Sequence, residues 1–239
     1  MSNLKISDYK LLKDIAENRL RPNVLSTFFL GAFFYSGIMA LVGWNAVRVL
    51  NYGKEFWEPI IPFVIALVGI QLVIAIFFMS ESRSYKYQKL QSYLIVVTYF
   101  KVSIDAYLVY FLACFDRNTG EFMIKFGVYL LISGLVYLMI STIRGFYRLK
   151  KGAFRKNGKG LYNFQNSKGY VSLPIIFVFV LLGGLLARAN FDYGLNAAGE
   201  VLLPLLGAFL VQNLISMMLP EFILVAYCKT KFKSFKITP

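Results

Sequence analysis

Long apolar runs separated by short polar segments dominate the pattern of this chain. A helix needs about 20 mainly apolar residues to cross the hydrocarbon core of a bilayer. The runs that meet this length are residues 24–47, 58–79, 92–114, 122–143, 169–187 and 201–226. The pattern predicts an all-α, polytopic integral membrane protein folded as a six-transmembrane-helix bundle.

The first 22 residues are polar but carry an apolar stripe at helical spacing. Tyr9, Leu12, Ala16 and Leu20 recur every three or four residues, and Pro22 follows them. This spacing predicts a short N-terminal amphipathic helix lying on the inner membrane surface, and the alternative is a disordered polar tail. We therefore divide the chain into a cytoplasmic amphipathic segment (1–22), a membrane domain (23–228) and a basic cytoplasmic tail (229–239).

Two charged residues lie inside the third apolar run. Lys101 and Asp105 are four residues apart and therefore share one face of a helix, and Thr98 extends the same polar stripe. An ionisable residue at this depth costs roughly 2.5–3.5 kcal/mol on insertion scales, so it must face protein or water and find a partner. The other spans are expected to pack around this helix.

Further polar side chains in other runs could meet this pair. Together they define an expected intramembrane polar cluster of Lys101, Asp105, Thr98, Gln71, Gln212, Asn213 and Glu221. One interpretation is an intrahelical ion pair that fixes the packing of the bundle. The other is a functional site, either for coupling to protons or cations or for recognising a charged helix of another membrane protein.

The first span carries small residues on one face. Ser36, Ala40 and Gly43 follow one another at spacings of four and three. Small residues in this arrangement let two membrane helices approach closely. We expect another span to pack against this stripe.

The basic residues are distributed unequally between the two sides of the predicted bundle. With six spans, 20 of the 26 lysines and arginines lie on the side of both termini and 4 on the other, and Lys101 and Lys125 lie in spans. Cytoplasmic loops are enriched in lysine and arginine. The asymmetry places both termini in the cytoplasm.

The longest loop between spans forms an expected basic cytoplasmic surface. Its cationic residues are Arg144, Arg148, Lys150, Lys151, Arg155, Lys156, Lys159 and Lys168. Aromatic residues accompany the bases at the ends of the inward-running spans, which is typical of anchoring in anionic lipid headgroups. The partners we expect are therefore an anionic bilayer and another membrane protein, with a homo-oligomer possible and no nucleic acid.

The composition argues against several kinds of chemistry. The chain has no histidine, which removes the commonest general base and metal ligand. Cys114 and Cys228 are predicted to lie at opposite membrane faces and have no histidine to activate them. Because no nucleophile elbow and no phosphate-binding loop occurs, we expect no enzymatic activity, no catalytic residue, no cofactor and no metal site.

Two function classes fit this description. The first is an accessory or immunity-type membrane protein that docks another membrane protein through its helices. The alternative is a six-span transporter or permease subunit, similar to an ABC exporter, that works with a cytoplasmic ATPase. The short loops and the isolated ion pair favour docking, whereas length and span number suit transport. The expected location is a plasma membrane, bacterial in origin.

Overall fold

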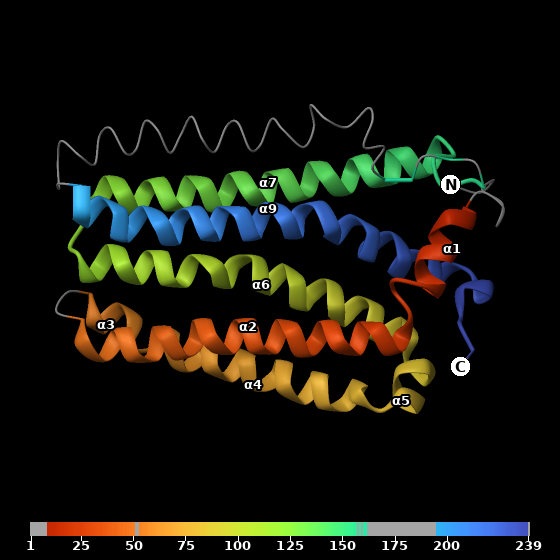
Figure 1. Cartoon of the computed structure of the whole chain (residues 1–239), viewed down its shortest axis with the longest axis horizontal. Helices are drawn as coiled ribbons and strands as arrows, with labels where there is room; N and C mark the ends of the chain where they lie inside the picture. Colours follow the sequence, from red (N-terminus) through yellow and green to blue (C-terminus); the bar gives the residue numbers. More distant parts are fainter. Residues whose placement is uncertain (1–8, 51–52, 157, 159, 162–194, 239) are drawn as a thin grey trace.

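In the computed structural model of this protein, the regular secondary structure of the described residues is all helical. The described residues are 9–50, 53–156, 158, 160, 161 and 195–238, with side chains from residue 200 onward in the last stretch. No strand occurs among them. The all-α, polytopic membrane bundle predicted from the sequence is confirmed, with its short N-terminal amphipathic helix (Figure 1).

Five of the described helical segments are long and apolar enough to cross a membrane: Pro22–Val49, Lys54–Met79, Gln88–Asp116, Glu121–Lys150 and Glu200–Lys231. The elements in chain order are α1 (Lys10–Glu17), α2 (Pro22–Val49), α3 (Lys54–Trp57), α4 (Ile60–Met79), α5 (Glu81–Lys86), α6 (Gln88–Asp116), α7 (Glu121–Lys150), α9 (Leu195–Lys231) and the 3-10 turn η2 (Lys233–Phe235). The predicted fifth span, residues 169–187, lies outside the described residues.

The helices extend past the apolar runs that predicted them. The run 122–143 lies within α7, which continues to Lys150, and the run 201–226 lies within α9, which continues to Lys231. Backbone hydrogen bonds hold a helix together whether or not its side chains are apolar. Hydropathy therefore locates the membrane-crossing part of a helix and not its ends.

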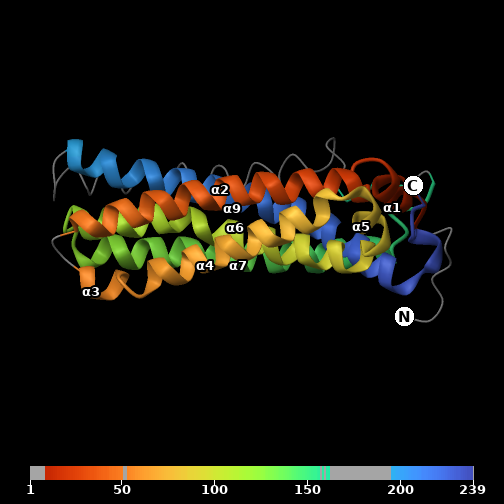
Figure 2. The same ribbon diagram turned by 90° about the horizontal axis from the view of Figure 1, so that it is seen from below.

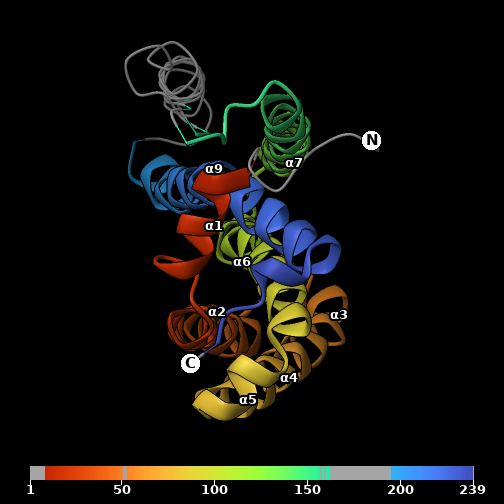
Figure 3. The same ribbon diagram turned by 90° about the vertical axis from the view of Figure 1, so that its right-hand side faces the viewer.

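The long helices run in two opposite directions along one common axis (Figures 1 and 2). α2 and α6 run one way, and α4, α7 and α9 run the other way. α6 packs most extensively against α9, α2 packs against α4 and α6, and α7 packs against α9. Seen along the bundle, α6 is central, with α2 and α4 on one side of it and α9 and α7 on the other (Figure 3).

The bundle contains two pairs of parallel helices, and one pair runs in the direction opposite to the other. α2 lies along α6, and α7 lies along α9. The buried positions of α2 include Leu25, Phe29, Ala32, Ser36, Ala40, Gly43 and Val47, and those of α7 include Met123, Gly127, Leu130, Gly134, Leu138, Ser141 and Gly145. The intervals between successive members of the two sets are identical. Intervals of three and four are those of any helix with one buried face, so α2 and α7 each bury a single face along most of their length.

The small-residue stripe predicted on the first span lies at a close helix contact. Ser36, Ala40 and Gly43 are all buried on α2. A Cβ atom placed on Gly43 would lie 2.9 Å from Ile61 Cδ1 and 3.2 Å from Leu108 Cδ2. Because the side chain of residue 43 is absent, both neighbouring helices approach α2 at this level.

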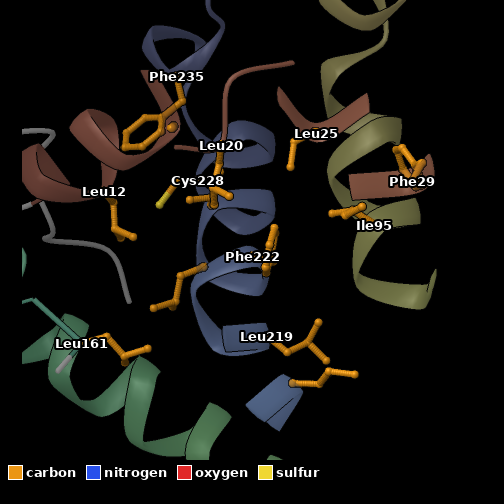
Figure 4. Packing of buried hydrophobic residues seen from close by; sticks show 14 of the residues in the cluster. Leu12, Leu20, Leu25, Phe29, Ile95, Leu161, Leu219, Phe222, Cys228 and Phe235 are labelled. Carbon is orange, nitrogen blue, oxygen red and sulfur yellow. The ribbon is translucent and has the colours of Figure 1, made fainter. Parts of the chain in front are cut away.

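The apolar stripe of α1 packs on protein and not on the membrane surface, contrary to our expectation. Tyr9 and Leu12 are completely buried, and the ring of Tyr9 lies 4.9 Å from that of Phe232 and 6.4 Å from that of Phe235. Figure 4 shows Leu12, Leu20 and Phe235 around the last turns of α9. The C-terminal segment thus provides the apolar surface that we had assigned to lipid.

Candidate functional site: a buried ion pair on α6

The predicted ion pair forms near the midpoint of α6. Lys101 Nζ lies 2.6 Å from Asp105 Oδ2, and their side chains are 18% and 9% exposed. The two residues are adjacent on one helical face because they are four positions apart. The carboxylate is thus neutralised from its own helix at a depth where water is scarce.

Neighbouring helices complete the surroundings of the pair. Ser36 of α2 donates its hydroxyl to Asp105 Oδ2 at 2.6 Å, so the same carboxylate oxygen accepts from both the ammonium and the hydroxyl. Lys101 Nζ also donates to Gln71 Oε1 of α4 at 3.0 Å. We refer to Ser36, Gln71, Lys101 and Asp105 as the charged cluster.

A second polar group lies on the opposite side of α6. Tyr107 donates its hydroxyl to Gln212 Oε1 at 2.7 Å, and Gln212 Nε2 donates to the backbone carbonyl of Leu131 at 3.1 Å. Gln212 is completely buried, and a Cβ atom on Gly134 of α7 would collide with its amide group. We refer to Tyr107, Leu131, Gly134 and Gln212 as the neutral cluster.

The structure does not bring all of the expected polar side chains into one cluster. It joins Gln71 to Lys101 and Asp105, whereas Gln212 belongs to the neutral cluster. Asn213 donates to the carbonyl of Phe209 in its own helix, and Thr98 is buried on α6. Glu221 lies farther along α9, where its Oε2 is 3.0 Å from Arg19 Nη2.

The reason for this separation is that α9 presents its polar side chains to different neighbours. Gln212 faces α6 and α7, whereas Glu221 faces the segment that follows α1. Hydropathy reveals the depth of a polar residue in a span but not the direction in which its side chain points.

The expected basic surface continues α7 at the end of the bundle where α1 and η2 lie (Figure 1). Arg144, Arg148 and Lys150 belong to the last turns of α7, and Lys151, Arg155 and Lys156 follow directly. Lys159 and Lys168 lie outside the described residues. The end of the bundle that carries these residues is called the basic end below.

Sequence reasoning missed four members of the two clusters, one of which, Leu131, takes part only through its backbone carbonyl. Ser36 had been assigned only to helix packing, and its hydrogen bond to Asp105 depends on how α2 packs on α6. Tyr107 was not distinguished from the many aromatic residues of the chain. Gly134 could have been found, because Gly127, Gly134 and Ser141 form a small-residue stripe on α7 like the one on α2.

The charged cluster provides oxygen atoms of the kind that hard metal cations prefer. A carboxylate, a hydroxyl and an amide carbonyl come from three helices, and Lys101 occupies the position of a cation between two of them. Within the described part of the chain, no group of three or more histidine, cysteine or acidic residues could hold a metal ion.

Comparison with known proteins assigns the chain to a family. Residues 17–151, more than half of the chain, match the family model described as "Mntp: Putative manganese efflux pump". No curated protein and no solved structure matches the chain. The match favours the transport alternative and gives no support to an accessory or immunity role. All four residues of the charged cluster lie within the matched stretch, and this multi-pass, transporter-like membrane protein belongs to the Mntp family.

Proposed function

We propose that this protein moves a divalent cation out of the cell without changing it chemically, and that the cation is Mn²⁺. The observation that carries the proposal is the buried carboxylate of Asp105 within the family-matched region. Among the described spans, Asp105 is the acidic side chain nearest the middle of a helix. Mn²⁺ favours oxygen ligands of this kind, and transporters place their substrate sites near the bilayer midplane.

Lys101 acts in this proposal as a tethered cation that keeps the empty site neutral. Its ammonium group lies 2.6 Å from the Asp105 carboxylate and 3.0 Å from the Gln71 carbonyl. A dication bound 4 Å from this ammonium would be repelled by about 8 kcal/mol at an effective dielectric of 20. The lysine must therefore leave the carboxylate when the cation binds, and its return favours release.

Transport of Mn²⁺ into liposomes that contain the purified full-length chain and an internal Mn²⁺-sensitive dye tests the proposal. We expect Asp105→Asn to reduce the rate by about 10–100-fold, the range for loss of a group that supports metal binding. Glu58→Gln is the matched control, because Glu58 is an exposed carboxylate on the segment that leads into α4. Equal rates for Asp105→Asn and the unmodified chain would refute the role of Asp105.

The same liposomes distinguish a self-sufficient transporter from a permease subunit. We expect Mn²⁺ to move down its gradient without ATP or an added ATPase. Lys101→Gln keeps a hydrogen-bonding side chain but removes the charge, so we expect a lower KM and a lower kcat because the cation binds more tightly and leaves more slowly. Flux that appears only with an ATPase present would support the permease interpretation instead.

We propose further that the protein lies in a plasma membrane with its basic end in the cytoplasm. The basis is the positive-inside distribution of lysine and arginine. Cys114 and Cys228 are buried, so single cysteines introduced at exposed positions report the orientation. In intact cells we expect a membrane-impermeant maleimide to label Lys54→Cys and to spare Lys156→Cys, and the opposite pattern would reverse the orientation.

A further inference from the structure

A groove of about 490 Å³ opens on the outside of the bundle between α6 and α7. The two helices each pack along α9 and touch one another much less, so α9 forms the floor of the groove. The lining residues are Val96, Val97, Phe100, Leu138, Met139, Thr142, Ile143, Leu219 and Ile223. The volume lies within the range of about 300–1,000 Å³ for small-molecule sites.

The lining is almost entirely apolar and belongs to membrane-crossing segments. Thr142 is the one polar side chain among the lining residues named above, and it donates to the carbonyl of Leu138 in its own helix. Apart from the oxygen of this hydroxyl, the lining side chains offer no hydrogen-bonding group to a polar ligand. An occupant at this depth in the bilayer must itself be apolar.

The three helices that line the groove, α6, α7 and α9, carry the same order of side chains toward the basic end. On α9, Leu219, Ile223, Tyr227 and Lys231 follow one another at intervals of four. On α6, Val97, Tyr93 and Lys89 do the same in the opposite chain direction, since α6 begins at the basic end. Toward the basic end, both helices thus present aliphatic residues first, then a tyrosine and then a lysine.

The third lining helix, α7, has the same order of apolar residue, tyrosine and lysine. Met139, Ile143 and Tyr147 are four residues apart, and Lys150 follows within one turn. Lys89, Lys150 and Lys231 are all exposed. At the basic end the hydroxyl groups of Tyr93 and Thr230 lie 2.9 Å apart and join α6 to α9.

The depth of the groove matches the position of an acyl chain beneath its headgroup. Val96 and Phe100 lie seven and eleven residues beyond Lys89 in α6. At 1.5 Å per residue the groove lies roughly 10–16 Å below the lysines. Tyrosine at the membrane interface and lysine at headgroup level, next to an apolar surface, form the chemistry that recognises an anionic lipid.

We propose that this groove is a specific site for an anionic phospholipid of the leaflet at the basic end. One acyl chain lies between α6 and α7 on the floor of α9. The headgroup phosphate lies between Lys89, Lys150 and Lys231, and the tyrosines border the glycerol region. The site is separate from the charged cluster, which faces α2 and α4.

Binding of phosphatidylglycerol and phosphatidylcholine to the purified full-length chain, followed by native mass spectrometry, tests the site. One lysine near an anionic headgroup contributes a factor of about five in affinity. We expect phosphatidylglycerol to bind more tightly by on the order of 100-fold for three lysines. The triple variant Lys89→Gln, Lys150→Gln, Lys231→Gln is expected to lose this preference.

The control variant removes the same charge from other exposed positions at the basic end: Lys10→Gln, Lys156→Gln and Lys236→Gln. It is expected to keep the preference. Thr142→Trp fills the groove without changing charge, and we expect it to lose tightly bound lipid of both kinds. Circular dichroism and a monodisperse elution profile verify that each variant is folded.

Four results would overturn the proposal. The first is equal binding of the two lipids by the unmodified chain, and the second is an equal loss of preference in both triple variants. The third is full retention of phosphatidylglycerol by Thr142→Trp. A dimer cross-linked through Met139→Cys, with no lipid retained, would assign the groove to a second copy of the chain instead.

Discussion

The charged and neutral clusters lie at similar depth on opposite sides of α6, yet their chemistry differs. In the charged cluster, one carboxylate oxygen accepts from a lysine and a serine, and the side chain of Lys101 remains 18% exposed. In the neutral cluster, Gln212 is completely buried and is held by a tyrosine and a backbone carbonyl. Side-chain partners can be exchanged, whereas a helix carbonyl cannot move away from its helix.

This difference separates a site that can change partners from a fixed contact. The charged cluster contains an ammonium and a carboxylate that each need a counter-charge, so a competing cation can rearrange it. The neutral cluster holds α6, α7 and α9 together without any charge. We expect substitutions in the charged cluster to affect stability and transport together, and those in the neutral cluster to affect mainly stability.

The largest effect is expected from Asp105→Ala. Removal of this carboxylate leaves the Lys101 ammonium buried without its counter-ion, which costs about 3–5 kcal/mol. The double variant Lys101→Ala, Asp105→Ala removes both charges and should recover most of this loss. Reversible unfolding in mixed micelles measures the free energy of unfolding of Asp105→Ala, Lys101→Ala and the double variant. A loss in the double variant equal to the sum of the two single losses would show that the residues do not interact.

A smaller loss is expected from Ser36→Ala. The hydroxyl of Ser36 donates to a charged carboxylate at 2.6 Å, and hydrogen bonds to charged groups contribute about 1.5–3 kcal/mol. The carboxylate keeps Lys101, so the protein should still fold. The measurements are the unfolding free energy and the KM for Mn²⁺. If neither value changes, Ser36 does not contribute to the stability or function of the charged cluster.

Gly134→Ala tests the close approach of α7 and α9 at the neutral cluster. The new Cβ atom would meet the amide of Gln212, and overpacking of this kind costs about 1–3 kcal/mol. Gly37→Ala is the control, because a Cβ atom there meets nothing within 4 Å. The control should gain about 0.5–1 kcal/mol from helix propensity. Similar thermal stability of the two variants would argue against the close contact.

The smallest effect is expected from Tyr107→Phe, which also removes one hydroxyl. The lost bond joins two neutral side chains inside a membrane bundle, where such bonds contribute about 0.6 kcal/mol on average. Gln212 keeps its bond to the Leu131 carbonyl. Thermal unfolding compared directly with Ser36→Ala provides the test, and a loss larger than that of Ser36→Ala would reverse the contrast between the clusters.

The sequence predicted what depends on one helix at a time. The apolar runs revealed the five described spans, and the four-residue interval between Lys101 and Asp105 revealed the ion pair, because both are properties of a single helix. The stripe of Tyr9, Leu12, Ala16 and Leu20 was found correctly, but its neighbour was taken to be lipid. An amphipathic stripe reveals that a face is covered, not what covers it.

The partners from other helices were much harder to foresee. Gln71 and Gln212 were equally good candidates for the ion pair, since both are amides near the middle of a span. Only the packing of α4 and α9 around α6 decides between them, and it brings Gln71 to Lys101 and Gln212 to Tyr107. Such assignments depend on the rotation of each helix, which hydropathy does not specify.

The opposite directions of α2 and α7 also bear on how the molecule inserts. With long helices running both ways, helix direction alone does not mark one side of the bilayer. The lysines and arginines gathered at one end do provide such a mark. Moving a few of these charges to the opposite end should therefore yield molecules inserted upside down, with their interior contacts preserved.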